Sequence, residues 1–247
     1  PPLNPLYPIN QTFKLHSRPG ATRVIFLDFD GHDASTTIWG SGVGSAPIAR
    51  PFDLDGIPNT FSTTERQRIQ FIWARVAEDY LQYDLDVTTE DPGAAALKNT
   101  GTGRYGVRVV IGGDSTDWYG ASAGGVAYLF SFDDSEDLPC WVFPKGLADN
   151  EKNIAEACSH EAGHTLGLHH DGQTTPGVEY YTGQGNWAPI MGVGYDHPIV
   201  QWSQGEYNLA NNSEDDLAKM LSFGAINRPD DYGDSIFNSM GDILAMA

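Results

Sequence analysis

One short stretch holds residues with the types and the spacing of a catalytic metal site. Residues 160–170 run His-Glu-Ala-Gly-His-Thr-Leu-Gly-Leu-His-His. On a helix, side chains four residues apart lie one above the other, so His160 and His164 could offer two imidazole nitrogens to one ion. Gly167 can adopt a positive φ without strain, which would end the helix and bring His170 back as a third ligand. Three protein ligands leave the fourth position of a tetrahedral zinc ion open, as in catalytic zinc sites.

Glu161 is the candidate general base of this site. Its position next to His160 puts a carboxylate beside water at the open position, where it can accept the proton while zinc lowers the pKa of that water. Zinc binding itself does not need this glutamate, so its presence favours an enzyme. His169 is the alternative third ligand; the spacing selects His170, and we expect His169 to face away.

The stretch resembles the long consensus of the metzincin clan of zinc endopeptidases, H-E-x-x-H-x-x-G-x-x-H, at every fixed position. Ala188-Pro189-Ile190-Met191-Gly192 is similar to the Met-turn of that clan. The resemblance implies that Met191 packs beneath the metal as an apolar floor. His170-Asp171 is similar to the adamalysin and snapalysin branches. Astacins and serralysins have a tyrosine two residues after the methionine, where this chain has Val193, and its next tyrosine is Tyr195.

The resemblance also implies a mixed α/β fold of the zincin (α+β) type: a twisted mixed sheet with an antiparallel edge strand, long helices, an active-site helix and a small C-terminal part with the Met-turn. In the clan the edge strand binds substrate by pairing with an added peptide strand, a role carried over here to residues 123–130. We expect residues 1–20 to form an extended arm. Residues 21–247 would form one catalytic domain, with an upper part to residue 168 and a lower part from residue 169.

Residue patterns predict the same order of elements. Apolar runs predict strands, and apolar residues at helical spacing behind capping residues predict helices. The expected strands cover 23–30, 86–89, 107–111, 124–130 and 138–143, and the expected helices run from Ser62 to about Tyr80, from Asp149 or Asn150 to Gly167, and over 213–221.

Charge limits the classes of partner. The formal net charge is -19 at pH 7, which argues against nucleic acids and anionic membranes because phosphate binding needs a basic face. There is no run of about 18 apolar residues that could span a bilayer. We expect protein or peptide substrates and assume a monomer, although nothing indicates the oligomeric state. No signal peptide opens the chain, but we expect a secreted, trimmed protein because such a peptidase would damage the cytoplasm.

Two further expectations concern stabilising links. Cys140 and Cys158 are the only cysteines, an even number compatible with a disulfide in a secreted protein. We predict that they are joined and tie the active helix to the preceding strand. Acidic residues also form two clusters, which we interpret either as structural calcium sites or as a polar strand end and a solvated loop. Their members are Asp28, Asp30 and Asp33, and Asp133, Asp134, Glu136 and Asp137.

The function expected from these features is that of a secreted zinc endopeptidase with Glu161 as general base. One alternative is a gluzincin-type peptidase with Glu179 or Glu206 as third ligand, which Gly167 and His170 disfavour. The other is a catalytically silent zinc- or calcium-dependent binding module.

Overall fold

The computed structural model describes residues 4–42 and 46–229. Residues 1–3 of the expected arm, residues 43–45 of a predicted loop and the tail from 230 to 247 lie outside the described residues. The helices are α1 (Ile38–Gly42), α2 (Thr63–Asp79), α3 (Glu151–Thr165) and α4 (Asp216–Ser222). The strands are β1 (Arg23–Asp28), β2 (His32–Asp33), β3 (Ile48–Ala49), β4 (Leu85–Thr88), β5 (Tyr105–Ile111), β6 (Gly125–Val126), β7 (Cys140–Val142), β8 (Trp187–Pro189) and β9 (Ile199–Gln201).

A five-stranded sheet carries the fold, with strand order β4-β1-β5-β7-β6. The first four strands are parallel and β6 is antiparallel to β7. Every residue of β5 is buried, as expected for a central parallel strand covered on both faces. The predicted α/β class and the antiparallel edge strand are therefore confirmed. The edge strand is shorter than the sequence suggested, because only Gly125 and Val126 pair with β7.

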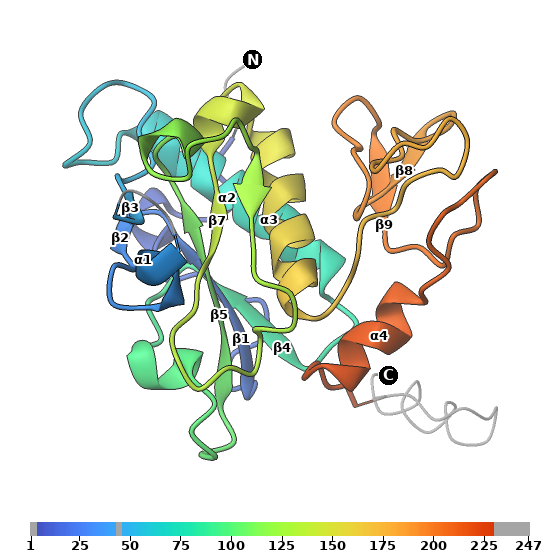
Figure 1. Ribbon diagram of the computed structural model, residues 1–247. Helices are drawn as coiled ribbons and strands as arrows, with labels where there is room; N and C mark the ends of the chain where they lie inside the picture. Colours follow the sequence, from blue (N-terminus) through green and yellow to red (C-terminus); the bar gives the residue numbers. More distant parts are fainter. Residues whose placement is uncertain (1–3, 43–45, 230–247) are drawn as a thin grey trace, which may run out of the picture.

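Alternate residues of the strands enter two different cores. Val109 and the paired Cys140 pack in the main core with α2 and α3, whereas Val110 and the paired Trp141 lie in a second cluster with Trp39 of α1. This alternation follows from the two-residue side-chain period of a strand. The helices α2 and α3 thus cover one face of the sheet and lie against each other (Figure 1).

The helix α2 holds α3 in place. It begins at the predicted capping box, in which Ser62 and Glu65 each satisfy the backbone N–H of the other. At its other end the hydroxyl of Tyr80 donates to the carbonyl of Ser159 on α3 at 2.9 Å, and the hydroxyl of Ser159 donates to Asp79 at 2.6 Å. These bonds fix the middle of α3 one residue before the first candidate ligand.

The chain after α3 forms the smaller lower part of the molecule. It contains the two-stranded parallel sheet β8–β9 and the short helix α4, beside α3 (Figure 1). Ile190, Met191 and Met220 from this part are buried in the main core together with α3 residues. The lower part is therefore joined to the upper part through the same apolar core.

Residues 4–20, which we expected to be an extended arm, pack along α2 and β4. Leu15 is buried, and the short 3-10 helix Ile9–Gln11 forms. The amide of Tyr7 donates to the side chain of Gln70 on α2 at 2.9 Å. The amide of Ser17 donates to the carbonyl of Val87 on β4 at 3.0 Å. Burial of the apolar side chain of Leu15 in the main core stabilises the docked position of this segment.

The predicted disulfide is wrong. Cys140 on β7 and Cys158 on α3 are free thiols. Both are fully buried in the apolar layer between the sheet and the helix, where a thiol behaves as a small hydrophobic group. Burial raises the pKa of both thiols well above its usual value. An even cysteine count allowed the pairing, but the count does not bring two sulfur atoms into bonding geometry.

The acidic clusters are neutralised differently from what we expected. Arg108 of β5 lies between them and donates to Asp28 at 2.6 Å and to Asp137 at 2.8 Å. For Asp28 and Asp137, the positive charge that calcium would have supplied therefore comes from Arg108. Burial raises the pKa of Asp28 to about 7 even though Arg108 opposes the shift. Among the described residues, no common metal site is formed by Asp28, Asp30, Asp33, Asp133, Asp134, Glu136 and Asp137.

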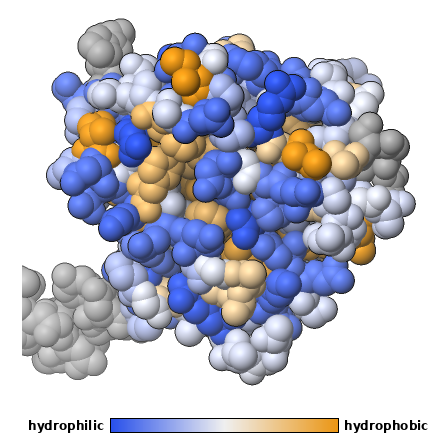
Figure 2. Space-filling model, turned by 90° about the vertical axis from the view of Figure 1, so that its left-hand side faces the viewer, coloured by the Kyte–Doolittle hydropathy of each residue, from blue (hydrophilic) through white to orange (hydrophobic). Residues whose placement is uncertain are grey.

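Within the ranges that the structure covers, no helix has the length and apolar character needed to cross a membrane. Figure 2 views the molecule from the side of α1 and shows mostly hydrophilic side chains, with hydrophobic ones in small groups. This surface agrees with the strongly acidic composition.

Candidate metal centre

The helix α3 presents the first two histidines on one face. Asn150 caps the helix by accepting from the amides of Lys152 and Asn153, at 3.0 and 3.2 Å. His160 and His164 lie one turn apart, and their ring centroids are 4.7 Å apart. Each is only 9% exposed, so both rings are held by packing as well as by the helix.

Gly167 ends the helix in the way the sequence suggested. Its φ is +91°, and two bonds of a Schellman motif close the turn: the amide of Gly167 donates to the carbonyl of His164 at 2.9 Å, and the amide of Leu168 to that of Gly163 at 3.1 Å. A Cβ at Gly167 would also lie 2.8 Å from Phe223. Both the backbone conformation and the space therefore favour glycine here.

Hydrogen bonds set the tautomers of the three rings. Nδ1 of His160 donates to the carbonyl of Ile190 at 2.9 Å, and Nδ1 of His164 donates to the carbonyl of Leu168 at 2.8 Å. Nδ1 of His170 contacts the carboxylate of Glu179 at 2.7 Å. A carbonyl or carboxylate oxygen can only accept, so each Nδ1 carries the proton and each neutral ring keeps a lone pair on Nε2. This outer arrangement is typical of histidines that bind metals.

The three histidines converge as a metal-sized group. One ring nitrogen from each lies within 4.8 Å of the others, and Nε2 of His164 is 2.9 Å from Nε2 of His170. Two such lone pairs repel each other unless a cation lies between them. Tetrahedral zinc with bonds of about 2.0–2.1 Å would separate its nitrogens by roughly 3.3 Å. The group fits a metal ion, and a small outward movement of the rings would admit one.

Burial keeps the three rings in the form that binds metal. Desolvation lowers the pKa of His160 well below its usual value and that of His164 to about 4, and it also lowers the pKa of His170. A metal needs the neutral imidazole. The rings are therefore ready to act as ligands at neutral pH without first losing a proton.

The side chain of Glu161 extends from α3 toward the edge strand. A Cβ at Gly125 of β6 would come within 2.5 Å of Oε1 of Glu161, so the carboxylate rests directly against that strand. Burial raises its pKa to about 8. Among the hydrogen bonds of the described residues, none reaches this carboxylate. In the metal-free protein this carboxyl group is therefore mostly protonated at neutral pH, and a cation held by the histidines would lower its pKa and favour the carboxylate.

The turn 188–192 lies beneath the site. Met191 is fully buried, and a Cβ at Gly163, between the two helical histidines, would come within 3.0 Å of its sulfur. The turn also holds two ligand segments, because Ile190 accepts from His160 and the carbonyl of Met191 accepts from the amide of Asp171 at 2.9 Å. Met191 therefore packs against α3 between the two helical histidines.

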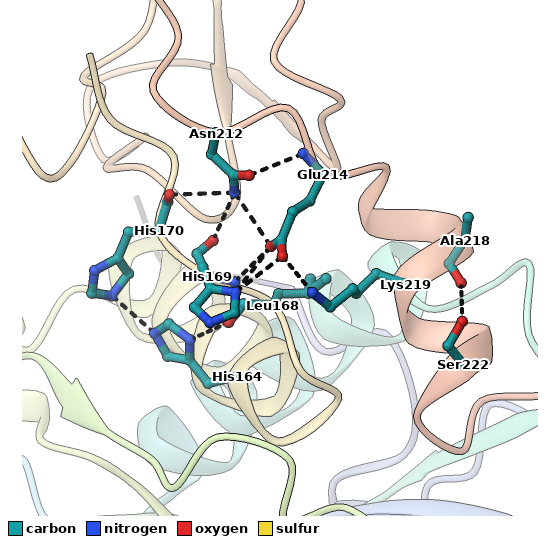
Figure 3. Close-up of polar contacts among 9 residues, drawn as sticks. All are labelled: His164, Leu168, His169, His170, Asn212, Glu214, Ala218, Lys219 and Ser222. Atoms are coloured by element: carbon teal, nitrogen blue, oxygen red, sulfur yellow. Dashed lines mark hydrogen bonds and ion pairs between the residues drawn. The ribbon is translucent and has the colours of Figure 1, made fainter. Parts of the chain in front are cut away.

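The alternative ligands lie elsewhere. His169 faces Glu214, with its Nδ1 3.0 Å from that carboxylate, whereas His170 joins His164 (Figure 3). Glu179 contacts the outer nitrogen of His170 and is not part of the metal-sized group. Glu206 accepts from the hydroxyl of Ser203 at 3.1 Å. The set of His160, His164 and His170 is therefore the one that the structure brings together.

Two tyrosines lie near the site, and the sequence comparison with the clan had pointed only to Tyr195. The ring of Tyr180 lies 4.2 Å from that of His170 and is 38% exposed. Burial raises the pKa of Tyr180 and of Tyr195 to about 12, with the charge of Glu161 adding to both shifts. Both hydroxyls therefore keep their protons at neutral pH. Tyr180 lies in a loop, where no helical or strand pattern shows which side chains face the site. The only signal in the sequence was that the loop after His170 is rich in tyrosine.

A second group of possible ligands consists of Asp53, Asp55 and Glu65. Its oxygens already have partners. Asp53 accepts from the amides of the following loop, and Glu65 accepts from Leu54 and Ser62. These hydrogen bonds hold the loop that contains Asp53 and Asp55 against the start of α2, which explains why the three acidic residues lie close together.

Comparisons with known proteins do not assign the chain to a family: no protein-family model matches it, and no curated protein matches it. The geometry itself supports a narrower statement. The described residues contain a three-histidine group, His160, His164 and His170, that could hold a metal ion.

Proposed function

We propose that this protein is a zinc-dependent endopeptidase that hydrolyses peptide bonds in proteins or peptides. The observation that carries the proposal is the convergence of three histidines, each with Nδ1 committed as a donor, followed on the same helix by Glu161, whose carboxyl group has no hydrogen-bond partner among the described residues. Metal binding alone would require the histidines and not Glu161.

Zinc is the ion that suits this donor set best. Three imidazole nitrogens from one helix and the following loop match catalytic zinc sites, which keep one position open. Bound there, zinc would supply Lewis-acid activation of a water molecule and of the substrate carbonyl. His160, His164 and His170 would be its protein ligands.

Glu161 then performs the proton transfers. With its pKa lowered by the charge of the bound cation, the carboxylate would accept a proton from the attacking water and pass it to the amine that leaves when the peptide bond breaks. A substrate strand pairing with the edge at Gly125 and Val126 would pass directly over this carboxylate, because Glu161 rests against Gly125. Tyr180, protonated and partly exposed beside His170, is placed to donate to the carbonyl oxygen as negative charge develops on it.

A simple assay tests the proposal. A denatured protein substrate is incubated with the purified chain before and after removal of metal by a chelator, and then after zinc is restored. We expect cleavage that disappears with the metal and returns with zinc. Stoichiometric zinc without cleavage of any peptide in a broad library would instead support the silent binding module.

The proposed activity also bears on location. An unspecific endopeptidase is one that cells keep outside the cytoplasm, so the proposal includes a secreted protein. Fractionation of the producing cells, with antibody detection of the chain, would test this part separately.

A further inference from the structure

The third ligand differs from the other two in how it is held. His160 and His164 are fixed by the helix α3, whereas His170 follows the turn at Gly167 and belongs to a loop. The carboxylate that contacts its ring, Glu179, has a side chain that is 67% exposed, and exposed pairs of this kind contribute little. Something else must therefore keep the backbone of His170 in position.

A second segment of the chain forms hydrogen bonds with the loop that carries His170, residues 168–172, which we call the ligand loop. We call Asn211, Asn212 and Glu214 the 211–214 clamp. The side-chain oxygen of Asn211 accepts from the amide of Gly172 at 2.8 Å, and the amide of Asn211 donates back to the carbonyl of Gly172 at 3.2 Å. The clamp thus holds the chain just after His170.

The clamp also holds the chain at His169 and His170 themselves. The carboxylate of Glu214 accepts from both the backbone amide and Nδ1 of His169, at 3.2 and 3.0 Å. The side-chain amide of Asn212 donates to the carbonyls of His169 and His170, each at 3.4 Å (Figure 3). One carboxylate and one side-chain amide therefore contact the backbone of two consecutive residues, His169 and His170.

Glu214 is well placed to act as a rigid support. Its side chain is only 21% exposed, and it is paired with Lys219 of α4 (Figure 3). The backbone amide of Glu214 donates to the side-chain oxygen of Asn212 at 2.9 Å. This bond orients the side-chain amide of Asn212 toward the loop that carries His170. Hydrogen bonds to an ionised group are stronger than those between neutral groups. The ligand loop is therefore anchored to the start of the last helix.

We propose that Glu214, with the help of Asn212, is a positioning residue that keeps the backbone of His170 in place so that its Nε2 stays directed at the metal. The inference rests on the metal centre of the proposed function. The Met-turn holds the opposite side of the same loop through the bond between Asp171 and Met191. Tyr207 also holds the chain after His170, because its hydroxyl donates to the carbonyl of Gly172 at 2.9 Å. Removing the clamp should therefore loosen the third ligand while the rest of the loop stays attached.

The test measures metal binding directly. Zinc affinity is determined by competition with a chromophoric chelator for the wild type, Glu214→Ala, Glu214→Gln and Asn212→Ala. Ser222→Ala is the matched control, because its hydroxyl bonds Ala218 on the same helix without touching the clamp (Figure 3). Loss of a group that orients a ligand typically weakens metal affinity 10–100-fold. We expect this loss in Glu214→Ala, a smaller one in Glu214→Gln and Asn212→Ala, and none in Ser222→Ala.

A second measurement separates positioning from general stability. Each variant is loaded with cobalt(II), whose visible absorption depends on the number and geometry of its ligands. We expect weaker absorption in Glu214→Ala, as for a site that has lost a nitrogen ligand, while the metal-free melting temperature stays near that of Ser222→Ala.

The outcomes are distinguishable. Wild-type zinc affinity and an unchanged cobalt spectrum in the Glu214 variants would overturn the inference but leave the proposed function standing. A wild-type chain that binds no zinc would overturn both. If Glu214→Ala does not fold, Glu214→Gln and Asn212→Ala decide by the same criteria.

Discussion

Replacing Glu161 with glutamine separates the chemistry from the metal centre. The substitution keeps the shape of a side chain that rests against Gly125 and removes the group that accepts the proton. General acid–base catalysis contributes about 10²–10⁴-fold, which corresponds to a barrier increase of about 3–5 kcal/mol. We therefore expect peptide cleavage to fall by at least a hundredfold.

Metal binding and folding should respond differently. No bond from Glu161 to the described residues would be lost, so zinc content should equal that of the wild type. Burial raises the pKa of Glu161 from 4.5 to about 8, so its contribution to the stability of the metal-free protein is present at low pH and is lost as the pH rises through 8. The neutral glutamine should thus match the wild type near pH 4 and be at least as stable at pH 9.

The assays are steady-state cleavage of a quenched fluorescent peptide, zinc analysis after gel filtration, and thermal unfolding at both pH values. A Glu161→Gln protein that cleaves at the parental rate would refute the assignment of the general base. Loss of zinc together with activity would place Glu161 in the metal site instead, contrary to the geometry.

Three further predictions use other parts of the structure. Tyr180→Phe should lower kcat about tenfold or more, by analogy with other oxyanion donors, while zinc content stays unchanged; an unaltered kcat would show that the hydroxyl does not assist. Gly167→Ala places a Cβ 2.8 Å from Phe223 at a φ of +91°, so thermal unfolding should show a loss of about 2 kcal/mol or more; wild-type stability would contradict the strain argument. Burial, with Asp171 nearby, raises the pKa of Asp216 from 3.8 to about 8 and leaves its Oδ1 without a partner. The wild type should therefore lose stability as the pH rises from 4 through 8, and Asp216→Asn should remove the part of that loss that comes from Asp216, a gain of about 1–3 kcal/mol above pH 8. Stability differences between the two proteins that stay constant from pH 4 to pH 9 in urea unfolding would argue against it.

The features that sequence alone determined are local ones. The capping box at Ser62, the face shared by His160 and His164, and the turn at Gly167 depend on neighbours within one or two helical turns. The strand pattern likewise depends on the period of the backbone. These interactions act over a few residues, so residue type and spacing were enough to predict the main strands, α3 and the three-histidine group, whereas the antiparallel edge strand was expected only from the family resemblance.

The features that sequence did not determine depend on contacts between distant segments. Arg108 pairs with Asp28 across 80 positions and with Asp137 across 29, so a strand arginine contacts one carboxylate of each acidic cluster, which the sequence did not indicate. An even number of cysteines did not place Cys140 and Cys158 in bonding geometry.

The environment of the third ligand was decided by tertiary structure in the same way. Glu214 reaches His169 across 45 positions, and the sequence around it indicated only the start of a helix. The ring of Tyr180 lies 4.2 Å from that of His170 because the path of its loop brings it there. Spacing along the chain selects residues that can bind a metal, but the packing of remote segments decides what holds them and which groups surround the substrate.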